Sequence, residues 1–246
     1  MSTREAICLV AVCATTALTA AATCSAAAGT LEAGLVALRA GYDTMALPQL
    51  EEAERLLRAE AAGPDPSGEA HYHLARALEG LAIYHVNIAQ TDTAVRYLQA
   101  GVAEAKVALE RDPSSSPFHT TLGNLYGQLA GQGGLTDKIR YGRMAVASYN
   151  RALELDPRNA MAHVGVGIGK LQTPPMFGGS AVEAIAEFRT AQSLDPSCVE
   201  AWTWEGIAQR RQGAVPDARA AFTHALTISP KNDHARRELA ALDEDF

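Results

Sequence analysis

The sequence predicts an all-α protein built from stacked helix pairs, and two observations support this prediction. Hydrophobic residues make up 48% of the 246-residue chain and aromatic residues only 6%, a composition that suits closely packed, Ala-rich helices better than a β-sandwich. In addition, one skeleton recurs along the chain: a small residue, an apolar or aromatic residue four positions later, Ala three later and Pro five later.

The four copies of this skeleton are Gly101, Ala105, Ala108 and Pro113; Ala145, Tyr149, Ala152 and Pro157; Ala184, Phe188, Ala191 and Pro196; and Ala218, Phe222, Ala225 and Pro230. Intervals of four and three place the first three residues on one face of a helix. Pro, together with the residue before it, ends that helix. Each copy is therefore expected to be the second helix of a pair.

The first 28 residues are typical of an export signal. Arg4 is followed by an uncharged stretch over residues 6–22 and then by small residues up to Ala28. We predict a signal peptide over 1–28 and a periplasmic or secreted mature protein. The uncharged stretch is shorter than the roughly 20 apolar residues that span a bilayer, and an uncleaved membrane anchor or a lipidated Cys24 are the alternatives.

The remaining chain, 29–246, divides into units at the Pro residues. The predicted units are 30–66 and 69–113, which are degenerate, then 116–157, 160–196 and 199–230, which are clearer, and a polar helix over 232–243 that caps the array. Several units exceed 34 residues, the interval from Pro196 to Pro230. We place the excess in loops over 130–142 and 171–180, where Gly and Pro gather.

The last complete unit resembles the tetratricopeptide repeat (TPR). It carries, in the order of that pattern, Trp202, Gly206, Ala218, Phe222 and Pro230. It departs from the pattern where Glu205 replaces Leu and Gln209 replaces Tyr, which suggests a less completely buried helix. His119 and His163 stand in the Trp slot of the two preceding units.

The resemblance implies a TPR-type right-handed helical-hairpin solenoid of about five helix pairs plus a C-terminal capping helix. It also implies a scaffold that binds a protein or peptide and catalyses nothing. The Pro-Pro-Met-Phe-Gly-Gly run at 174–179 is similar to an insert in extracytoplasmic bacterial TPR proteins such as the T components of TRAP transporters. The alternative function is therefore an accessory of a solute-uptake system that binds a small hydrophobic ligand or assembles as an oligomer.

Several other classes of site are not supported by the residue pattern. The net charge of −7 disfavours a nucleic-acid partner. His71 and His73 are two apart, so they point to different sides of a helix, and no metal-binding motif or cofactor is predicted. Gly165 and Gly167 lie inside an expected helix, where they suit close packing better than a phosphate loop. Cys198 is expected to be a small buried filler.

A binding surface is predicted on the first helix of each unit, which lines the inner side of such an array. The candidates are Thr120, Asn124, Met161, Val164, Ile168, Thr203, Trp204, Ile207, Arg210 and Arg211. Val164 and Ile168 are equally well explained by packing on the adjacent unit. Trp204 lies about 200° around the helix from Trp202, so we expect it at the surface. The competing hypothesis packs Trp204 under the terminal helix or against the loop at 174–177.

Overall fold

The helices follow one another in antiparallel pairs. The computed structural model describes residues 29–63 and 68–244, and every regular element within these ranges is a helix. The first covers residues 29–44. The others are α2 (Leu47–Ala61), α3 (Glu69–Asn87), α4 (Thr91–Arg111), α5 (Ser116–Gln132), α6 (Leu135–Leu155), α7 (Ala160–Gln172), the short 3₁₀ helix η1 (Pro175–Phe177), α8 (Ala181–Leu194), α9 (Val199–Arg211), α10 (Val215–Ile228) and α11 (Asp233–Glu244).

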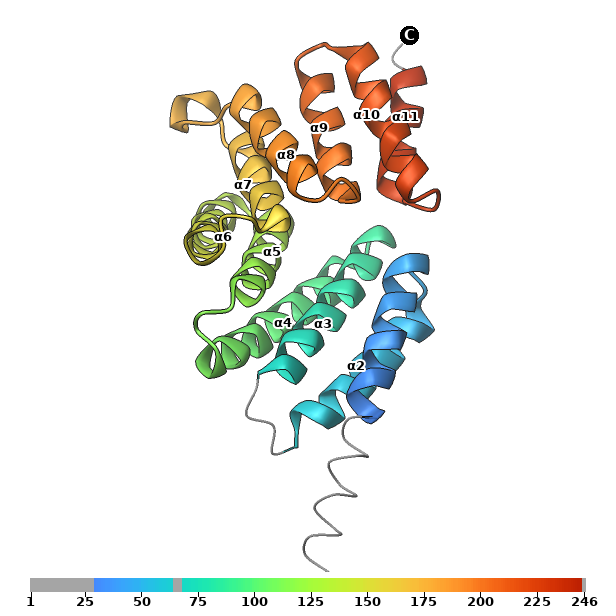
Figure 1. The fold of residues 1–246 in the computed structure, drawn as a ribbon, viewed down its shortest axis with the longest axis vertical. Helices are drawn as coiled ribbons and strands as arrows, with labels where there is room; N and C mark the ends of the chain where they lie inside the picture. The colour runs from blue at the N-terminus through green and yellow to red at the C-terminus, as the bar shows by residue number, and fades with distance from the viewer. Residues whose placement is uncertain (1–28, 64–67, 245–246) are drawn as a thin grey trace, which may run out of the picture.

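These helices confirm the predicted all-α class. The first helix of each pair, α3, α5, α7 or α9, packs on its second helix, and neighbouring pairs stack in chain order (Figure 1). The predicted signal peptide over 1–28, with Cys24, lies outside the described residues, and so does Pro66.

Asp-Pro turns end three of the second helices. Asp112, Asp156 and Asp195 are C-cap residues, and each donates its backbone N–H to the carbonyl of the skeleton Ala four residues earlier, at 2.8 to 2.9 Å. Each carboxylate then accepts the backbone N–H of the residue two positions later. The Pro that follows disfavours a helical conformation in the Asp. The predicted helix ends at these prolines are therefore confirmed.

A ring N–H six residues after the Pro ties each of three first helices to the preceding turn. Nε2 of His119 lies 3.1 Å from the Pro113 carbonyl oxygen. His163 repeats this contact with the preceding Pro at 3.1 Å, and the Trp202 indole donates to its own at 3.2 Å. Because a carbonyl only accepts, Nε2 carries the hydrogen in both histidines.

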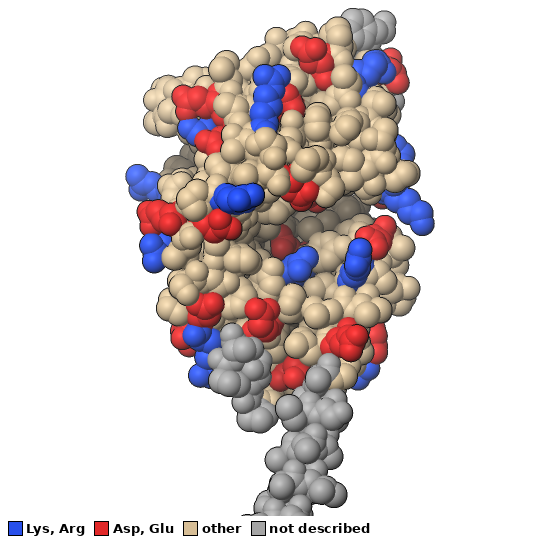
Figure 2. All heavy atoms as spheres, in the orientation of Figure 1, with Lys and Arg blue, Asp and Glu red and all other residues tan. Residues whose placement is uncertain are grey.

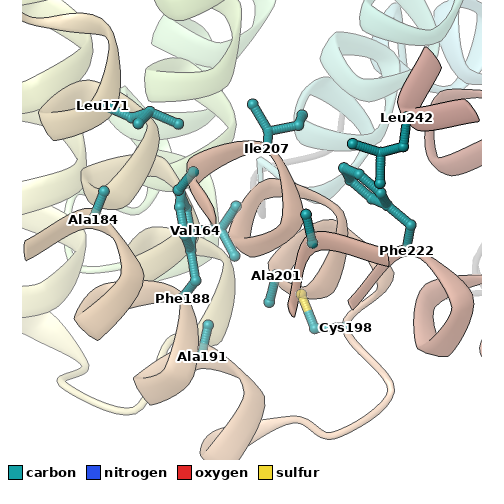
Figure 3. Packing of buried hydrophobic residues seen from close by; sticks show 12 residues of the cluster. Val164, Leu171, Ala184, Phe188, Ala191, Cys198, Ala201, Ile207, Phe222 and Leu242 are labelled. Atoms are coloured by element: carbon teal, nitrogen blue, oxygen red, sulfur yellow. The ribbon is translucent and has the colours of Figure 1, made fainter. Parts of the chain in front are cut away.

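Close packing within the C-terminal pairs rests on a glycine beneath an aromatic ring. A Cβ atom on Gly167 would lie 2.5 Å from the ring of Phe188, and one on Gly206 would lie 2.5 Å from the ring of Phe222. Both phenylalanines are fully buried (Figure 3). The same close approach explains Gly165, whose Cβ would lie 2.3 Å from Tyr149. The glycines of α7 thus serve helix packing, as their position in the sequence predicts.

The extra residues of the third pair lengthen its helices, and the loop predicted over 130–142 is wrong. α5 continues to Gln132 and α6 begins at Leu135, so only Gly133 and Gly134 connect them. The segment 135–142 contains helix-favouring residues and no Pro, and a single pair of glycines suffices for the turn. The segment 173–180, in contrast, does connect α7 to α8 outside an α-helix, with η1 in its middle.

Glu205 is buried, contrary to the expectation that its helix is less covered there. The residue is 4% exposed and accepts hydrogen bonds from Arg189 Nε at 2.9 Å, Gln192 Nε2 at 2.6 Å and Gln209 Nε2 at 2.9 Å. Three donors satisfy the carboxylate, and one of them is a cation. A polar network has taken the place of the Leu and Tyr of the TPR pattern.

The terminal helix α11 covers the end of the array. It packs on α9 and α10 through its own residues Ala235 and Leu242, which are buried. The Asn232 side chain accepts the backbone N–H of Ala235 at 2.8 Å, which starts the helix. The opposite face of α11 is polar, as a capping element requires.

The pairs wind so that the two halves of the array face each other. In Figure 1 the half containing α8 to α11 lies above the half containing α2 to α4, and α5 to α7 join them at one side. Figure 2 shows the surface hollowed between these halves, with acidic and basic side chains around the hollow.

Candidate functional site

The concave side of the array is the surface lined by the first helix of each pair. Along it α3 contacts α5, α5 contacts α7, and α7 contacts α9. Side chains that form hydrogen bonds from one of these first helices to another lie on the concave side. Such side chains form a cluster at α3 and α5.

Arg76 of α3 lies among aromatic rings in this cluster. Its guanidinium carbon is 5.7 Å from the ring centroids of both Tyr42 and Tyr72. The Tyr42 hydroxyl donates to the Arg76 backbone carbonyl at 2.8 Å, which joins the first described helix to α3. Burial, together with the charge of Glu79, holds the pKa of Tyr42 well above its usual range, so the phenol keeps its proton.

Glu79 occupies the same face of α3 one turn later. It is 7% exposed, and its Oε1 accepts a hydrogen bond of 2.7 Å from Gln128 Nε2 of α5. Burial raises the pKa of this carboxyl from 4.5 to about 7, although Arg76 and Gln128 oppose the shift. Glu200, on α9 across the array, adds to the increase.

Tyr149 closes the cluster on the side of the second helices. Its hydroxyl donates to Asn124 Oδ1 of α5 at 2.9 Å, and its ring lies against Gly123 and Gly165. Asn124 is half-buried on the concave side. The predicted site residue Asn124 therefore belongs to the same region as Glu79 and Gln128.

Four predicted site residues are buried inside the array. They are Thr120, Val164, Thr203 and Ile207, each no more than 5% exposed. The two threonine hydroxyls donate to backbone carbonyls four residues earlier, and Val164 and Ile207 share one apolar cluster with Phe188 and Phe222 (Figure 3). Packing between adjacent units explains their positions, because neighbouring first helices cover these side chains.

Trp204 is half-buried against the terminal helix, whereas the sequence analysis expected it at the surface. The indole is half-buried against the C-terminal apolar cluster, and its ring meets His234 of α11 edge to face at 5.5 Å. The competing hypothesis, which placed it under the terminal helix, is the one that the structure supports. Trp202 instead lies against His224 of α10, with ring centroids 4.0 Å apart.

The two predicted arginines make contacts within the chain. Arg210 forms an ion pair of 2.9 Å with Glu238 of α11, and Arg211 Nη1 donates to the Leu171 carbonyl at 2.9 Å. The predicted site residues Met161 and Ile168 are half-buried at the edge of the C-terminal apolar cluster. As a ligand-binding set the ten candidates remain a prediction.

Two exposed apolar features lie where first helices turn into second helices. Leu135 and Ile139 of α6 are 76% and 56% exposed and flank Arg140 and Arg143 in a shallow depression. Met176 and Phe177 of η1 are 83% and 73% exposed. These side chains offer exposed apolar contact area to a partner, whereas the concave cluster is polar.

The sequence analysis missed Glu79, Gln128, Tyr42 and Arg76. One signal for the first was available: Glu79 is a lone carboxyl inside the apolar run Ala77 to Ile83. Charged residues are rarely buried unless paired, so such a position marks a candidate site. No repeat pattern connects it to Gln128, which lies 49 residues later.

The described part of the chain offers neither a metal cluster nor a membrane span. Among residues 29–63 and 68–244 there is no group of three or more His, Cys, Asp and Glu side chains arranged to hold a metal ion. Within the same ranges no helix combines the length and apolar character needed to cross a bilayer. Burial raises the pKa of the Cys198 thiol to about 12, which is consistent with the predicted filler role.

Two known protein families match parts of this chain. The family described as Regulator of microtubule dynamics protein 1-3 matches residues 41–168, more than half of the chain. The chain belongs to this family. Its matching region runs from α2 to most of α7 and so includes α2 to α4, where the TPR pattern is weakest. A tetratricopeptide-repeat family matches residues 179–233 of this regulator of microtubule dynamics family member.

The TPR-repeat family match and one solved structure confirm the TPR solenoid. A thermophilic TPR protein of Thermus thermophilus is 22% identical, with a TM-score of 0.62 over 86% of this chain and 100% of that one. The MamA protein of Desulfovibrio magneticus RS-1 is 18% identical, with a TM-score of 0.44 over 84% and 97% of the two chains. No curated protein matches the sequence. The families matched are of regulators and of repeats, and neither indicates an enzyme.

Proposed function

We propose that this protein is a non-catalytic scaffold that binds a peptide segment of another protein along its concave side. The observation that carries the proposal is the polar character of that side between α3 and α5. There Glu79 and Gln128 meet across two first helices, with Arg76 and Asn124 nearby. The curved inner surface of stacked helix pairs is the usual binding surface of such arrays.

This polar cluster favours a peptide over a small hydrophobic ligand. A site for a solute-uptake accessory would need an enclosed apolar cavity, since such ligands are held mainly by apolar contact. The concave cluster instead presents a carboxyl group and amides, which match the backbone and side chains of a peptide. The exposed Met176 and Phe177 supply a second, apolar contact at the rim.

We further propose that the scaffold acts outside the cytoplasm. The support is the sequence of residues 1–28, with one Arg followed by an uncharged stretch and small residues. Retention of this segment would instead anchor the scaffold to a membrane. N-terminal sequencing of the native protein distinguishes the two outcomes, because cleavage removes Met1 and gives a new terminus near residue 29.

The family match favours a second candidate, a partner belonging to the microtubule system. The exposed face of α6 adds a specific observation, because Lys138, Arg140 and Arg143 lie beside Leu135 and Ile139 on a chain of net charge −7. A basic and apolar face suits an acidic protein surface. Co-sedimentation with polymerised tubulin would support this candidate, and a protein that remains in the supernatant at low salt would contradict it.

A bulky residue on the concave side tests the main proposal. Gly127 of α5 is exposed next to Gln128, and a Cβ there would meet only the Tyr149 hydroxyl, at 3.7 Å. Gly142 of α6, where a Cβ would meet nothing within 4 Å, is the matched control on a second helix. Peptides selected on the purified protein from a phage-displayed random dodecapeptide library are the probe.

We expect Gly127→Trp to weaken these peptides at least tenfold and Gly142→Trp to leave their affinity unchanged. The reason is that the indole would occupy the space in which a peptide lies, while both variants keep the fold. Fluorescence anisotropy measures the dissociation constants. Equal affinity for the wild type and both variants would show that the concave side is not the binding surface.

A further inference from the structure

Glu79 differs from the other charged groups of the array because it is buried without a cation. Among the described residues it forms no ion pair, and Gln128 is its hydrogen-bond donor. Burying a carboxylate is costly unless a cation or several donors compensate for the lost water. The site is therefore incomplete as it stands.

The nearest cation does not complete the site. Arg76 precedes Glu79 by less than one helical turn, yet its guanidinium lies over the rings of Tyr42 and Tyr72. It lowers the pKa of Glu79 through space but does not restore it to its usual range, and the value stays near 7. The contacts with the two aromatic rings hold the Arg76 guanidinium in this position.

One carboxyl oxygen of Glu79 remains available to a ligand. Oε1 accepts the Gln128 hydrogen bond, whereas Oε2 accepts none from the described residues. Nor is Oε2 one of the side-chain atoms that are shut off from solvent and lack a hydrogen-bond partner. It therefore keeps some contact with solvent. A donor from a ligand on the concave side can therefore bind this oxygen.

A second carboxyl group acts on this cluster from another first helix. Glu200 of α9 adds to the raised pKa of both Tyr42 and Glu79, so its negative charge is felt at the Glu79 carboxyl. Glu200 is exposed. Glu79 therefore experiences the charge of a second carboxylate as well as that of Arg76, whose guanidinium lies over two aromatic rings.

We propose that Glu79 and Gln128, together with the charge of Glu200, form a binding site for the cationic side chain of a Lys or Arg residue in the bound peptide. The cation donates to Glu79 Oε2, and the free Gln128 oxygen offers a further acceptor. Charge-assisted hydrogen bonds of this kind are stronger than neutral ones. This inference rests on the proposed function and specifies the chemistry of its partner.

The test uses the dodecapeptides selected on the wild-type protein. Each is synthesised with its Lys and Arg residues intact or replaced by Gln, and both forms are titrated against wild type, Glu79→Gln and Glu110→Gln. Glu110 is exposed on the second helix α4, so its substitution makes the same change in net charge away from the hollow. Glu79→Gln keeps an acceptor for Gln128, and thermal melts confirm that each variant folds.

We expect one basic residue of each peptide to be required, with at least a tenfold loss of affinity on its replacement by Gln. Glu79→Gln should cause a similar loss and should make the peptide substitution ineffective, while Glu110→Gln should retain wild-type behaviour. This non-additivity identifies a direct pair. At pH 6 binding should also release close to one proton from the wild type and none from Glu79→Gln, as calorimetry in two buffers measures.

Two results would overturn the inference, and they are distinguishable. Peptides that Gly127→Trp blocks but that bind Glu79→Gln as tightly as the wild type would show a concave binding site without a cation subsite. Peptides that neither Gly127→Trp nor Glu79→Gln affects would overturn the proposed function together with the inference. Failure to select any binding peptide would contradict both.

Discussion

Two buried carboxyl groups of this array differ in the number of donors and cations that compensate for their burial. Glu205, between α8 and α9, accepts hydrogen bonds from Arg189, Gln192 and Gln209 and is 4% exposed. Glu79, between α3 and α5, has a single donor and no ion pair among the described residues, at 7% exposure. The two groups are similarly buried, but only Glu205 has enough donors to compensate for the lost water. Glu205 therefore stabilises the fold, whereas Glu79 is available to a ligand.

The same contrast extends to the packing around each residue. The C-terminal half joins its helices through phenylalanine on glycine and covers its inner positions with Val164 and Ile207. The N-terminal half uses leucines such as Leu50 and leaves a polar cluster on its inner side. The regular repeats thus contribute a closely packed framework, and the candidate site lies where the degenerate unit of α3 meets the clearer unit of α5.

Removing the compensated carboxylate should give the largest effect. Glu205→Ala leaves the buried Gln209 amide, the half-buried Gln192 amide and a guanidinium without their acceptor, which typically costs about 3 kcal/mol of the free energy of unfolding. Arg189 is 64% exposed and can be hydrated, so the larger values seen for fully buried pairs are not expected. Urea denaturation measures the change, with the exposed Glu110→Ala as the control. A loss below about 1 kcal/mol, the scale of one ordinary hydrogen bond, would remove the distinction between the two carboxyl groups.

Removing the uncompensated carboxylate should have an effect that depends on pH. The pKa of Glu79 is raised from 4.5 to about 7 in the folded protein, so its ionisation destabilises the fold as pH rises through this interval. Glu79→Gln should match the wild type near pH 4, below both pKa values, and exceed its stability at pH 8 by on the order of 3 kcal/mol at most.

His73 adds a dependence of the opposite sign, because burial lowers its pKa from 6.5 to about 4 and its stabilising effect is lost as pH falls through that interval. It is present in both proteins, so it cancels in the difference between them. Urea denaturation at several pH values gives that difference. A wild type that is more stable than Glu79→Gln at pH 8 would mean that a cation within the chain already compensates Glu79.

The junction of the two halves gives the smallest predicted effect. Tyr149 lies between Gly123 and Gly165, and a methyl group on Gly165 would approach its ring to 2.3 Å. Gly165→Ala should therefore destabilise the protein by about 2 kcal/mol through overpacking. Gly142→Ala, with free space around it, should stabilise α6 by up to about 1 kcal/mol. Thermal melts that move in the same direction for both variants would contradict the role of Tyr149.

The sequence alone predicts the local parts of this fold well, because they depend on local chemistry. The skeleton alanines Ala108, Ala152, Ala191 and Ala225 are all fully buried, and the helices end before the prolines as expected. Helical periodicity fixes which face of a helix a residue occupies, and Pro fixes where the helix ends. These properties do not depend on how the units are placed relative to one another.

The candidate site depends on that placement, which explains why sequence reasoning did not find it. The sequence predicts that Thr120, Val164 and Thr203 lie on the inner surface, but in the structure these side chains are buried between neighbouring helices. Glu79 and Gln128 meet only after α3 and α5 have stacked.

The contact between a ring N–H and the preceding Pro carbonyl has a consequence for how degenerate repeats are recognised. His119, His163 and Trp202 differ in size, charge and aromatic surface, yet each contributes the same donor at the same distance along the chain. At this position histidine and tryptophan make the same hydrogen bond, whereas phenylalanine would leave the carbonyl without its donor. A repeat pattern that weighs hydrogen-bonding capacity instead of bulk at this position would detect divergent units that a pattern based on tryptophan overlooks.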